Sequence, residues 1–320
     1  MASGYCYKVK VPGSLMLFGE HAVLYGKTAL VGAINKYITV TLVFRADDLV
    51  YIKSSALGEH RIALKKFKIE DPFKFVLAAI KRKRAGLKCG FDLLIESDFS
   101  PTVGFGSSAA VTVATLAVLE HAMSGVIPDK LDLFHEALAV VRSVQKVGSG
   151  ADIAASIFGG ILAYRRGSHP KLYIKKLPKL IPLTVVYSGS KVATPIVVQA
   201  VKYLRAKHLK IFDCIYDAMD KCSLEAITAI KEQDLQRLGE LMNIHQGLQD
   251  AIGVNNVRLS ELIFALRSRK EIKGAKISGA GLGDCVIGLG KINSKCDGYI
   301  EQIELELTAN GLKSFGIKDS

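Results

Sequence analysis

The ten-residue string PTVGFGSSAA at positions 101–110 is the part of this sequence best suited to chemistry. Gly104 and Gly106 allow a tight turn that brings the backbone close to a ligand. Ser107 and Ser108 then stand at a helix N-terminus, where free N–H groups and the helix dipole favour a phosphate. A serine hydroxyl there can also ligate Mg²⁺, which prefers oxygen. The alternative is an ordinary serine N-cap after a glycine turn.

Two further glycine-containing segments stand out from the rest of the chain. PGSLMLFGEHAVLYG at 12–26 places Glu20 and His21 in an apolar setting between glycines. KISGAGLGDC at 276–285 has alternating glycines, which can form a backbone nest for an anion. Taken alone, a Glu-His pair is more often structural, and the third segment is no more than a tight β-turn.

Two common phosphate-binding motifs are excluded. The pattern GxGxxA at 104–109 fits the dinucleotide fingerprint, but that motif needs a following strand and an acid about 20 residues on. Here 129–144 is predicted to be a helix instead. The tripeptide GKT at 26–28 resembles the end of a Walker A loop, yet the first glycine of that motif would fall on His21.

The predicted elements place this chemistry at helix starts. We expect a strand over 90–97 before the first glycine turn and a helix over 107–123 after it. Another glycine turn precedes a short helix over 151–158. The proline-containing segment 176–182 is predicted to link two domains. The remaining expectations are helices within 193–270 and 296–309 and strands over 275–278, 284–289 and 313–317.

In this order and spacing, the three segments resemble the signature motifs of the GHMP kinase superfamily, the first in its mevalonate-kinase form. The resemblance spans nearly the whole chain. It implies an α+β fold with an N-terminal ATP-binding domain over 1–180 and a C-terminal ferredoxin-like domain over 181–320. It also implies ATP and Mg²⁺ as cofactors and a small-molecule acceptor bound between the domains.

The resemblance also assigns individual residues. Those of the ATP-phosphate loop are Gly104, Phe105, Gly106, Ser107, Ser108 and Ala109, with Ser107 as a Mg²⁺ ligand. Asp152 corresponds to the catalytic aspartate, whose carboxylate takes the acceptor hydroxyl's proton while the oxygen attacks the γ-phosphorus. The substrate-side positions are Ser14, Glu20, His21, Ser278, Gly279 and Ala280.

The chain departs from the family pattern at Ser14, where mevalonate kinases usually have a lysine that pairs with the catalytic aspartate. A serine cannot stabilise an aspartate or a phosphate as an ammonium can. The candidates to replace that charge are Lys27, Lys146 and Lys191. A catalytically weak homologue is the alternative.

A second departure concerns the metal. The family's Mg²⁺-ligating glutamate usually lies about ten residues before the aspartate, where this chain has Val141 and Arg142. Glu136 is the nearest upstream acid and becomes the candidate second ligand. In addition, Thr102 replaces the first glycine of the usual phosphate loop.

The resemblance implies phosphorylation of mevalonate to 5-phosphomevalonate. The segment KVGSGADIAASIFGG and the basic stretch 165–179 also resemble phosphomevalonate kinases, so that acceptor stays open. Another GHMP-type sugar or metabolite kinase, or a decarboxylase-type member, is a further alternative. The first motif favours mevalonate.

The net charge of +13 raises the different possibility of a nucleic-acid-binding protein. The charge lies in two patches, 61–88 with +8 and 165–179 with +6, so the rest of the chain nets −1. No basic motif with interleaved aromatics is present, and the three glycine-rich motifs contribute little charge. The charge therefore indicates two solvated faces rather than a nucleic-acid partner.

The remaining observations bear on location and assembly. Six cysteines without a CxxC pair indicate reduced thiols in the cytoplasm. The N-terminus lacks an apolar signal core. The uncharged run 99–119 has only about eleven continuous apolar residues, short of the roughly 20 that a membrane span needs. Dimers are common in the family, and the sequence alone does not decide the oligomeric state.

Overall fold

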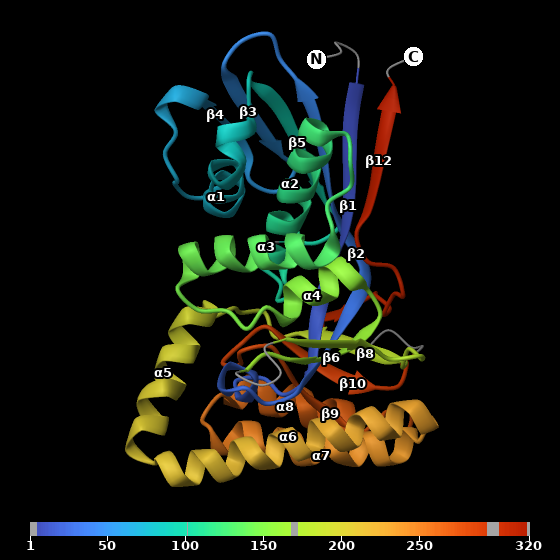
Figure 1. Ribbon diagram of the computed structural model, residues 1–320. Coiled ribbons are helices and arrows are strands. Elements are labelled where there is room, and N and C mark those ends of the chain that lie inside the picture. The colour runs from blue at the N-terminus through green and yellow to red at the C-terminus, as the bar shows by residue number, and fades with distance from the viewer. Residues whose placement is uncertain (1–4, 101, 168–171, 293–300, 319–320) are drawn as a thin grey trace.

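Two β-sheets carry helices packed on them; most of the first sheet lies in the upper half of Figure 1, and the second lies in the lower half. The computed structural model describes residues 5–100, 102–167, 172–292 and 301–318. The first sheet has eight strands in the order β12-β1-β2-β5-β3-β4, with β6 paired to β2 and β7 to β6. The second has four, in the order β11-β8-β10-β9. This mixed layout agrees with the α+β class expected from the sequence.

The strands of the first sheet are β1 (Tyr5–Phe18), β2 (Ala29–Phe44), β3 (Leu49–Ser54), β4 (Gly58–Ala63), β5 (Phe91–Ser97), β6 (Ile161–Arg165), β7 (Tyr173–Lys176) and β12 (Lys313–Lys318). Those of the second are β8 (Leu183–Tyr187), β9 (Ala275–Ser278), β10 (Cys285–Leu289) and β11 (Glu301–Ile303). All pairs are antiparallel except β3 with β5.

The helices of the first part are α1 (Lys74–Lys83), α2 (Ser107–Ser124), α3 (Lys130–Gln145) and α4 (Ala151–Phe158). Those of the second are α5 (Thr194–Lys207), α6 (Leu209–Glu232), α7 (Leu235–Ala251) and α8 (Val257–Arg267). Short 3₁₀ turns lie at 22–25, 64–66 and 84–86. Helices α2 and α4 pack on β1 and β2, while α7 and α8 pack on β9.

The long strand β1 connects the two parts of the molecule. Its register with β2 shifts twice, between Pro12 and Ser14 and between Met16 and Phe18. Its far end meets the second part, where Ser278 of β9 donates from Oγ to the Met16 carbonyl at 2.8 Å. The first motif therefore begins as an extended strand that holds Ser14, and it continues beyond Phe18 into the turn that holds Glu20 and His21.

The last strand, β12, returns to the first sheet and pairs with β1, from Tyr5 opposite Lys318 to Lys10 opposite Lys313. Figure 1 accordingly shows the start of β1 and the end of β12 side by side at one end of the molecule. The first sheet thus takes strands from both sides of the expected boundary at residue 180.

The helix predicted within 296–309 is wrong over 301–309, and 296–300 lie outside the described residues. Residues Glu301–Ile303 form β11 beside β8, and Leu307 bridges to Ile34. The apolar residues Ile303, Leu305 and Leu307 recur every second position, and the latter two are buried. Alternation with period two is the pattern of an extended segment.

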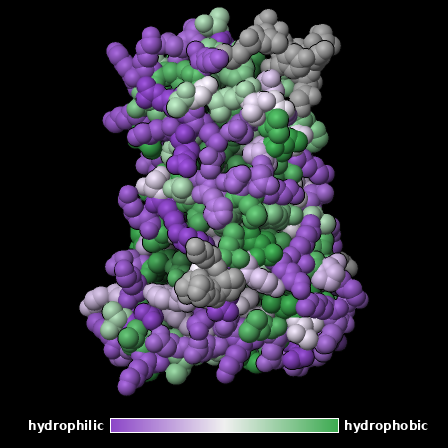
Figure 2. Space-filling model, in the orientation of Figure 1, coloured by the Kyte–Doolittle hydropathy of each residue, from purple (hydrophilic) through white to green (hydrophobic). Residues whose placement is uncertain are grey.

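Small side chains let α2 lie deep in the first part. Most of its length is buried, with Ala110, Ala114 and Ala117 fully inaccessible. On the face in Figure 2, hydrophilic side chains cover much of the two ends, while hydrophobic ones gather near mid-height. Among the described residues, no helix combines the length and apolarity needed to cross a bilayer.

Candidate active site

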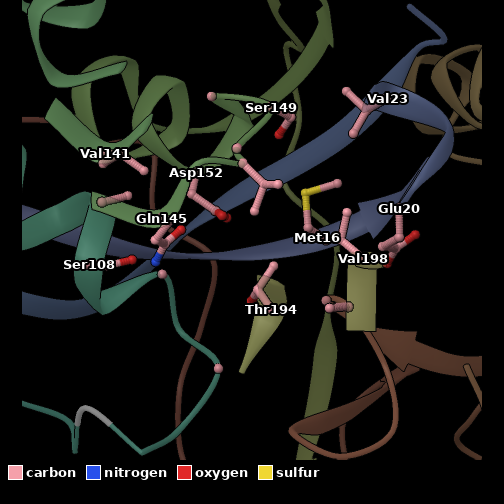
Figure 3. A pocket seen from close by; sticks show the side chains of 18 of the residues that line it. Met16, Glu20, Val23, Ser108, Val141, Gln145, Ser149, Asp152, Thr194 and Val198 are labelled. Carbon is pink, nitrogen blue, oxygen red and sulfur yellow. The ribbon is translucent and has the colours of Figure 1, made fainter. Parts of the chain in front are cut away.

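A pocket opens where β1, the start of α2, the start of α4 and the turn between β9 and β10 meet. Ten of the residues singled out in the sequence line it: Glu20, His21, Gly104, Gly106, Ser107, Ser108, Ala109, Asp152, Gly279 and Ala280. Figure 3 shows Asp152, Gln145 and Ser108 on one side of this pocket and Glu20 on the other, with Met16 between them. Segments distant in sequence therefore converge on one place.

The predicted phosphate-binding loop, residues 104–109, is tied to β1 through its backbone. Gly106 is the N-cap of α2 and has φ +65°, a left-handed conformation that favours glycine. Phe105 is buried against Phe99 rather than lining the pocket, and its carbonyl accepts from the Ser14 N–H at 3.0 Å. Phe105 thus anchors the loop, and the ligand-facing surface comes from its neighbours.

Substituting Gly106 by alanine should lower activity about tenfold or more. The new Cβ would lie 2.3 Å from Ser14 Oγ, so the hydroxyl must leave its place beside Asp152, and the left-handed backbone adds strain of about 1–3 kcal/mol. Gly125 is a matched control at the other end of α2, with φ +74° and nothing within 4 Å of an added Cβ. Steady-state ADP release would compare the two variants, and equal activity in both would contradict the close packing.

Asp152 is the second residue of α4, which begins after Gly150 at φ +96°. Ser14 Oγ donates to Asp152 Oδ1 at 2.9 Å. Burial raises the pKa of Asp152, while the Ser14 hydrogen bond and the positive charge of Lys191 oppose that rise. A carboxylate whose pKa is moved toward neutrality is suited to accept a proton.

Asp284 is a second carboxylate of the pocket that the sequence reading did not select. It stands at the end of the third glycine-rich segment, with φ +64°, and is buried. Its carboxylate packs on the phosphate-binding loop, because a Cβ added to Gly104 would lie 2.7 Å from Asp284 Cγ. Burial raises the pKa of Asp284 to about 6, and its Oδ1 has no hydrogen-bond partner among the described residues. In the sequence, the position of Asp284 directly after the third glycine-rich turn was the signal that could have identified it as a pocket residue.

Glu20 belongs to a buried polar cluster with Lys276 and His245. Lys276 Nζ donates to Glu20 Oε1 at 2.5 Å, and both side chains are almost fully inaccessible. The Gly19 N–H donates to His245 Nε2 at 3.0 Å, so that nitrogen carries no proton and the ring is neutral. Burial agrees with this, since it lowers the pKa of His245 to about 4. Glu20 is thus held in place from the second part of the molecule.

His21 is also neutral, because burial lowers its pKa. Its Nε2 lies 2.8 Å from the Ala280 carbonyl oxygen, which can only accept, so Nε2 carries the proton. The other ring nitrogen, Nδ1, is then an acceptor at the pocket wall. Ser278 does not line the pocket, and its hydroxyl instead fastens β9 to β1. These contacts close the third glycine-rich turn over the first motif.

Glu136 is not brought to this pocket. It lies on the α3 helix, and its carboxylate pairs with Lys83 of α1 at 2.6 Å, beside a second pair between Lys83 and Glu120. The candidate second metal ligand therefore serves as a link between helices. Among the described residues, no group of three or more His, Cys, Asp or Glu side chains is arranged to hold a metal ion. Any ion here would rely on ligand oxygens as well.

A second cavity, of about 540 Å³, adjoins the first at the start of α2. The two share Ser107, Ser108, Gln145, Lys191 and Thr194. Its wall is largely apolar, with Leu57, Phe73, Val76, Ile95 and Val111. The flat aromatic base of a nucleotide would fit this chamber while the nucleotide's phosphates reached the glycine-rich loop. The volume of the chamber lies in the usual range of ligand sites.

Comparison with known proteins agrees with this geometry. The family models described as GHMP kinases N terminal domain and GHMP kinases C terminal match residues 73–160 and 226–310. Curated mevalonate kinases from Archaeoglobus fulgidus and Aeropyrum pernix are 36% and 32% identical, covering 92% and 95% of this chain and 96% and 95% of theirs. The solved structure of L. major mevalonate kinase in complex with R-mevalonate has a TM-score of 0.74 at 25% identity, covering 89% of this chain and 87% of its own.

Proposed function

The chain belongs to the GHMP kinase family, whose two-domain fold it has, and from that premise we propose that it transfers the γ-phosphoryl group of ATP to mevalonate. The products are 5-phosphomevalonate and ADP. The observation that carries the proposal is the convergence of Asp152, the glycine loop and the first motif on one pocket. The curated relatives cover nearly the full chain and share the name mevalonate kinase.

Asp152 is the proposed base. Its carboxylate accepts the proton of the acceptor hydroxyl as the hydroxyl oxygen bonds to the γ-phosphorus. Ser14 orients the carboxylate through its hydrogen bond to Oδ1. The N–H groups at the start of α2 face the phosphates, where the helix dipole favours negative charge. The His21 Nδ1 acceptor is available to a hydroxyl of the substrate.

The oxygen donors present fit a Mg²⁺ ion bound together with nucleotide phosphates. Ser107 offers a hydroxyl, and Asp284 offers a buried Oδ1 without a hydrogen-bond partner among the described residues. Mg²⁺ in such sites is held by one or two carboxylates, phosphate oxygens and water. The ion would neutralise phosphate charge during transfer. We propose Ser107 and Asp284 as the protein oxygens nearest to it.

The charges of the pocket favour the neutral hydroxyl of mevalonate over its phosphate ester. Asp152 and Asp284 are acidic, Glu20 is paired with Lys276, and Lys191 is the one lysine or arginine among the described lining residues. None of the described residues of the basic stretch 165–179 lines the pocket. A phosphorylated acceptor would add at least one negative charge beside these carboxylates, at an electrostatic cost.

The proposal predicts ADP release with mevalonate and ATP that exceeds the rate with 5-phosphomevalonate by at least about 10²-fold in kcat/KM. A coupled assay with both acceptors side by side measures the ratio, and mass spectrometry of the product identifies the phosphorylated position. Turnover confined to the phosphorylated acid would replace this proposal by phosphomevalonate kinase activity.

For location, we propose the cytoplasm, supported by the free thiols of Cys89, Cys214, Cys222 and Cys285. A homodimer stays a prediction. The proposed partners are small molecules alone, because no residue of 61–88 and no described residue of 165–179 lines the pocket that holds Asp152.

A further inference from the structure

Position 14 faces the reaction centre, yet it holds no charge. The Ser14 hydroxyl lies 2.9 Å from Asp152 Oδ1, and the same hydroxyl lies against Gly106 of the phosphate-binding loop. A serine there supplies a hydrogen bond but leaves the developing phosphate charge without a neighbouring cation. Phosphoryl transfer depends mainly on positioning and on such electrostatic stabilisation.

The other basic groups near the pocket either do not line it or are neutral. Lys276 is buried against Glu20, and Lys27 pairs with Asp217 of α6. His21 carries no charge near neutral pH because burial lowers its pKa. Lys146 is the C-cap of α3 and is not among the lining residues.

Lys191 lies between the phosphate-binding loop and the third glycine-rich turn. The Asp284 N–H donates to the Ser190 carbonyl at 2.8 Å, which fixes the segment before Lys191 to the start of β10. The Lys191 Nζ lies 3.5 Å from the carbonyl oxygen of Val103, two residues after the start of the phosphate-loop string. Lys191 also lines both the pocket and the adjoining apolar chamber.

The charge of Lys191 reaches the carboxylate of Asp152. It lowers the pKa of Asp152, against the larger effect of burial. Lys191, Asp152 and Asp284 line the same pocket, so the ammonium shares it with carboxylates contributed by α4 and by the turn before β10. Two carboxylates and an incoming polyphosphate make a strongly anionic site, which a single well-placed ammonium relieves.

We propose that Lys191 is the catalytic cation of this kinase and supplies from the second part of the molecule the charge that Ser14 lacks. The inference rests on the proposed function. In the reaction the acceptor oxygen bonds to the γ-phosphorus, its proton passes to Asp152, and the bond to the bridging oxygen breaks. ADP leaves with that electron pair. Lys191 stabilises the negative charge on the transferring group and on the leaving oxygen.

The test combines Lys191→Met with Ser14→Lys. We expect K191M to lower kcat about 10²-fold, the usual effect of removing one electrostatic donor, while ADP affinity measured by calorimetry changes less than threefold. The double variant S14K/K191M should have a kcat at least tenfold higher than that of K191M, because its new ammonium stands beside Asp152. K191R, which keeps the charge, should fall between wild type and K191M.

Lys146→Met is the matched control. Lys146 is exposed and adjoins pocket-lining residues in sequence but does not itself line the pocket, so this variant should keep kcat within twofold of wild type. The inference is overturned if K191M keeps kcat within threefold of wild type, or if S14K restores nothing. The proposed function is tested separately, by the activity of the wild-type enzyme with mevalonate as acceptor. The ratio of K191M to wild type is then taken with whichever acceptor wild type phosphorylates.

Discussion

Replacing Asp152 by asparagine is expected to lower kcat by about 10³-fold, within the range that general bases contribute. Asparagine keeps the shape of the side chain and an oxygen that can accept from Ser14 Oγ, so the contact at 2.9 Å survives. What disappears is the ability to take a proton. Nucleotide affinity, measured by calorimetry with ADP, should stay within about threefold of wild type, and ADP release with mevalonate measures kcat.

Ser14→Ala is the companion variant, because it removes the hydrogen bond and keeps the carboxylate. The Ser14 hydroxyl lowers the pKa of Asp152, so its loss should raise that pKa further and move the acidic limb of the kcat/KM profile to higher pH. Activity at high pH should fall far less than in D152N. A D152N enzyme with normal kcat, or an S14A profile moved to lower pH, would remove Asp152 from the role of base.

The three glycine-rich segments were readable from sequence because each carries its signal locally. A turn that requires a left-handed residue, followed by a small-residue helix, predicts both the loop and the start of α2. The same holds for Gly150 and α4, which place Asp152 at a helix N-terminus. Spacing within one segment of chain is sufficient for such inferences.

Contacts between distant segments were not readable. Glu136 is directed to Lys83 by the packing of α3 against α1, and no local pattern distinguishes that pairing from metal ligation. Phe105 looks like part of a ligand-binding loop until the fold buries it against Phe99. The choice of Lys191 over the other lysines depends on Asp284, which contacts both Ser190 and Gly104 of the phosphate-binding loop, and only tertiary structure determines those contacts.

The misread helix within 296–309 has a local cause. In this segment glutamates alternate with isoleucine and leucine, a pattern that fits both a helix and an extended strand. The segment is too short for its length to decide between the two. The neighbouring strand β8 and the bridge to Ile34 select the extended form. Tertiary pairing thus overrode an ambiguous local preference.

The second large effect concerns stability, at the buried pair of Lys276 and Glu20. Lys276→Met should lower the free energy of unfolding by about 3–5 kcal/mol, the usual cost of leaving one member of a buried ion pair uncompensated. Methionine fills most of the space of the lysine stem, so a cavity contributes little. Glu20, only 2% exposed, already has an Oε2 without a hydrogen-bond partner among the described residues, so it has no second donor to turn to. Urea denaturation followed by circular dichroism measures the loss.

The double variant E20Q/K276M separates charge from packing. If the loss in K276M comes from the stranded Glu20 carboxylate, neutralising that carboxylate should recover at least half of it, because removing both members of a buried pair is far less costly than removing one. E20Q alone leaves the buried Lys276 ammonium without its carboxylate and should also be strongly destabilising. A double variant no more stable than K276M would mean that Lys276 supports the β9 strand by packing alone. The carboxylate would then gain nothing from its partner, although the two atoms lie 2.5 Å apart.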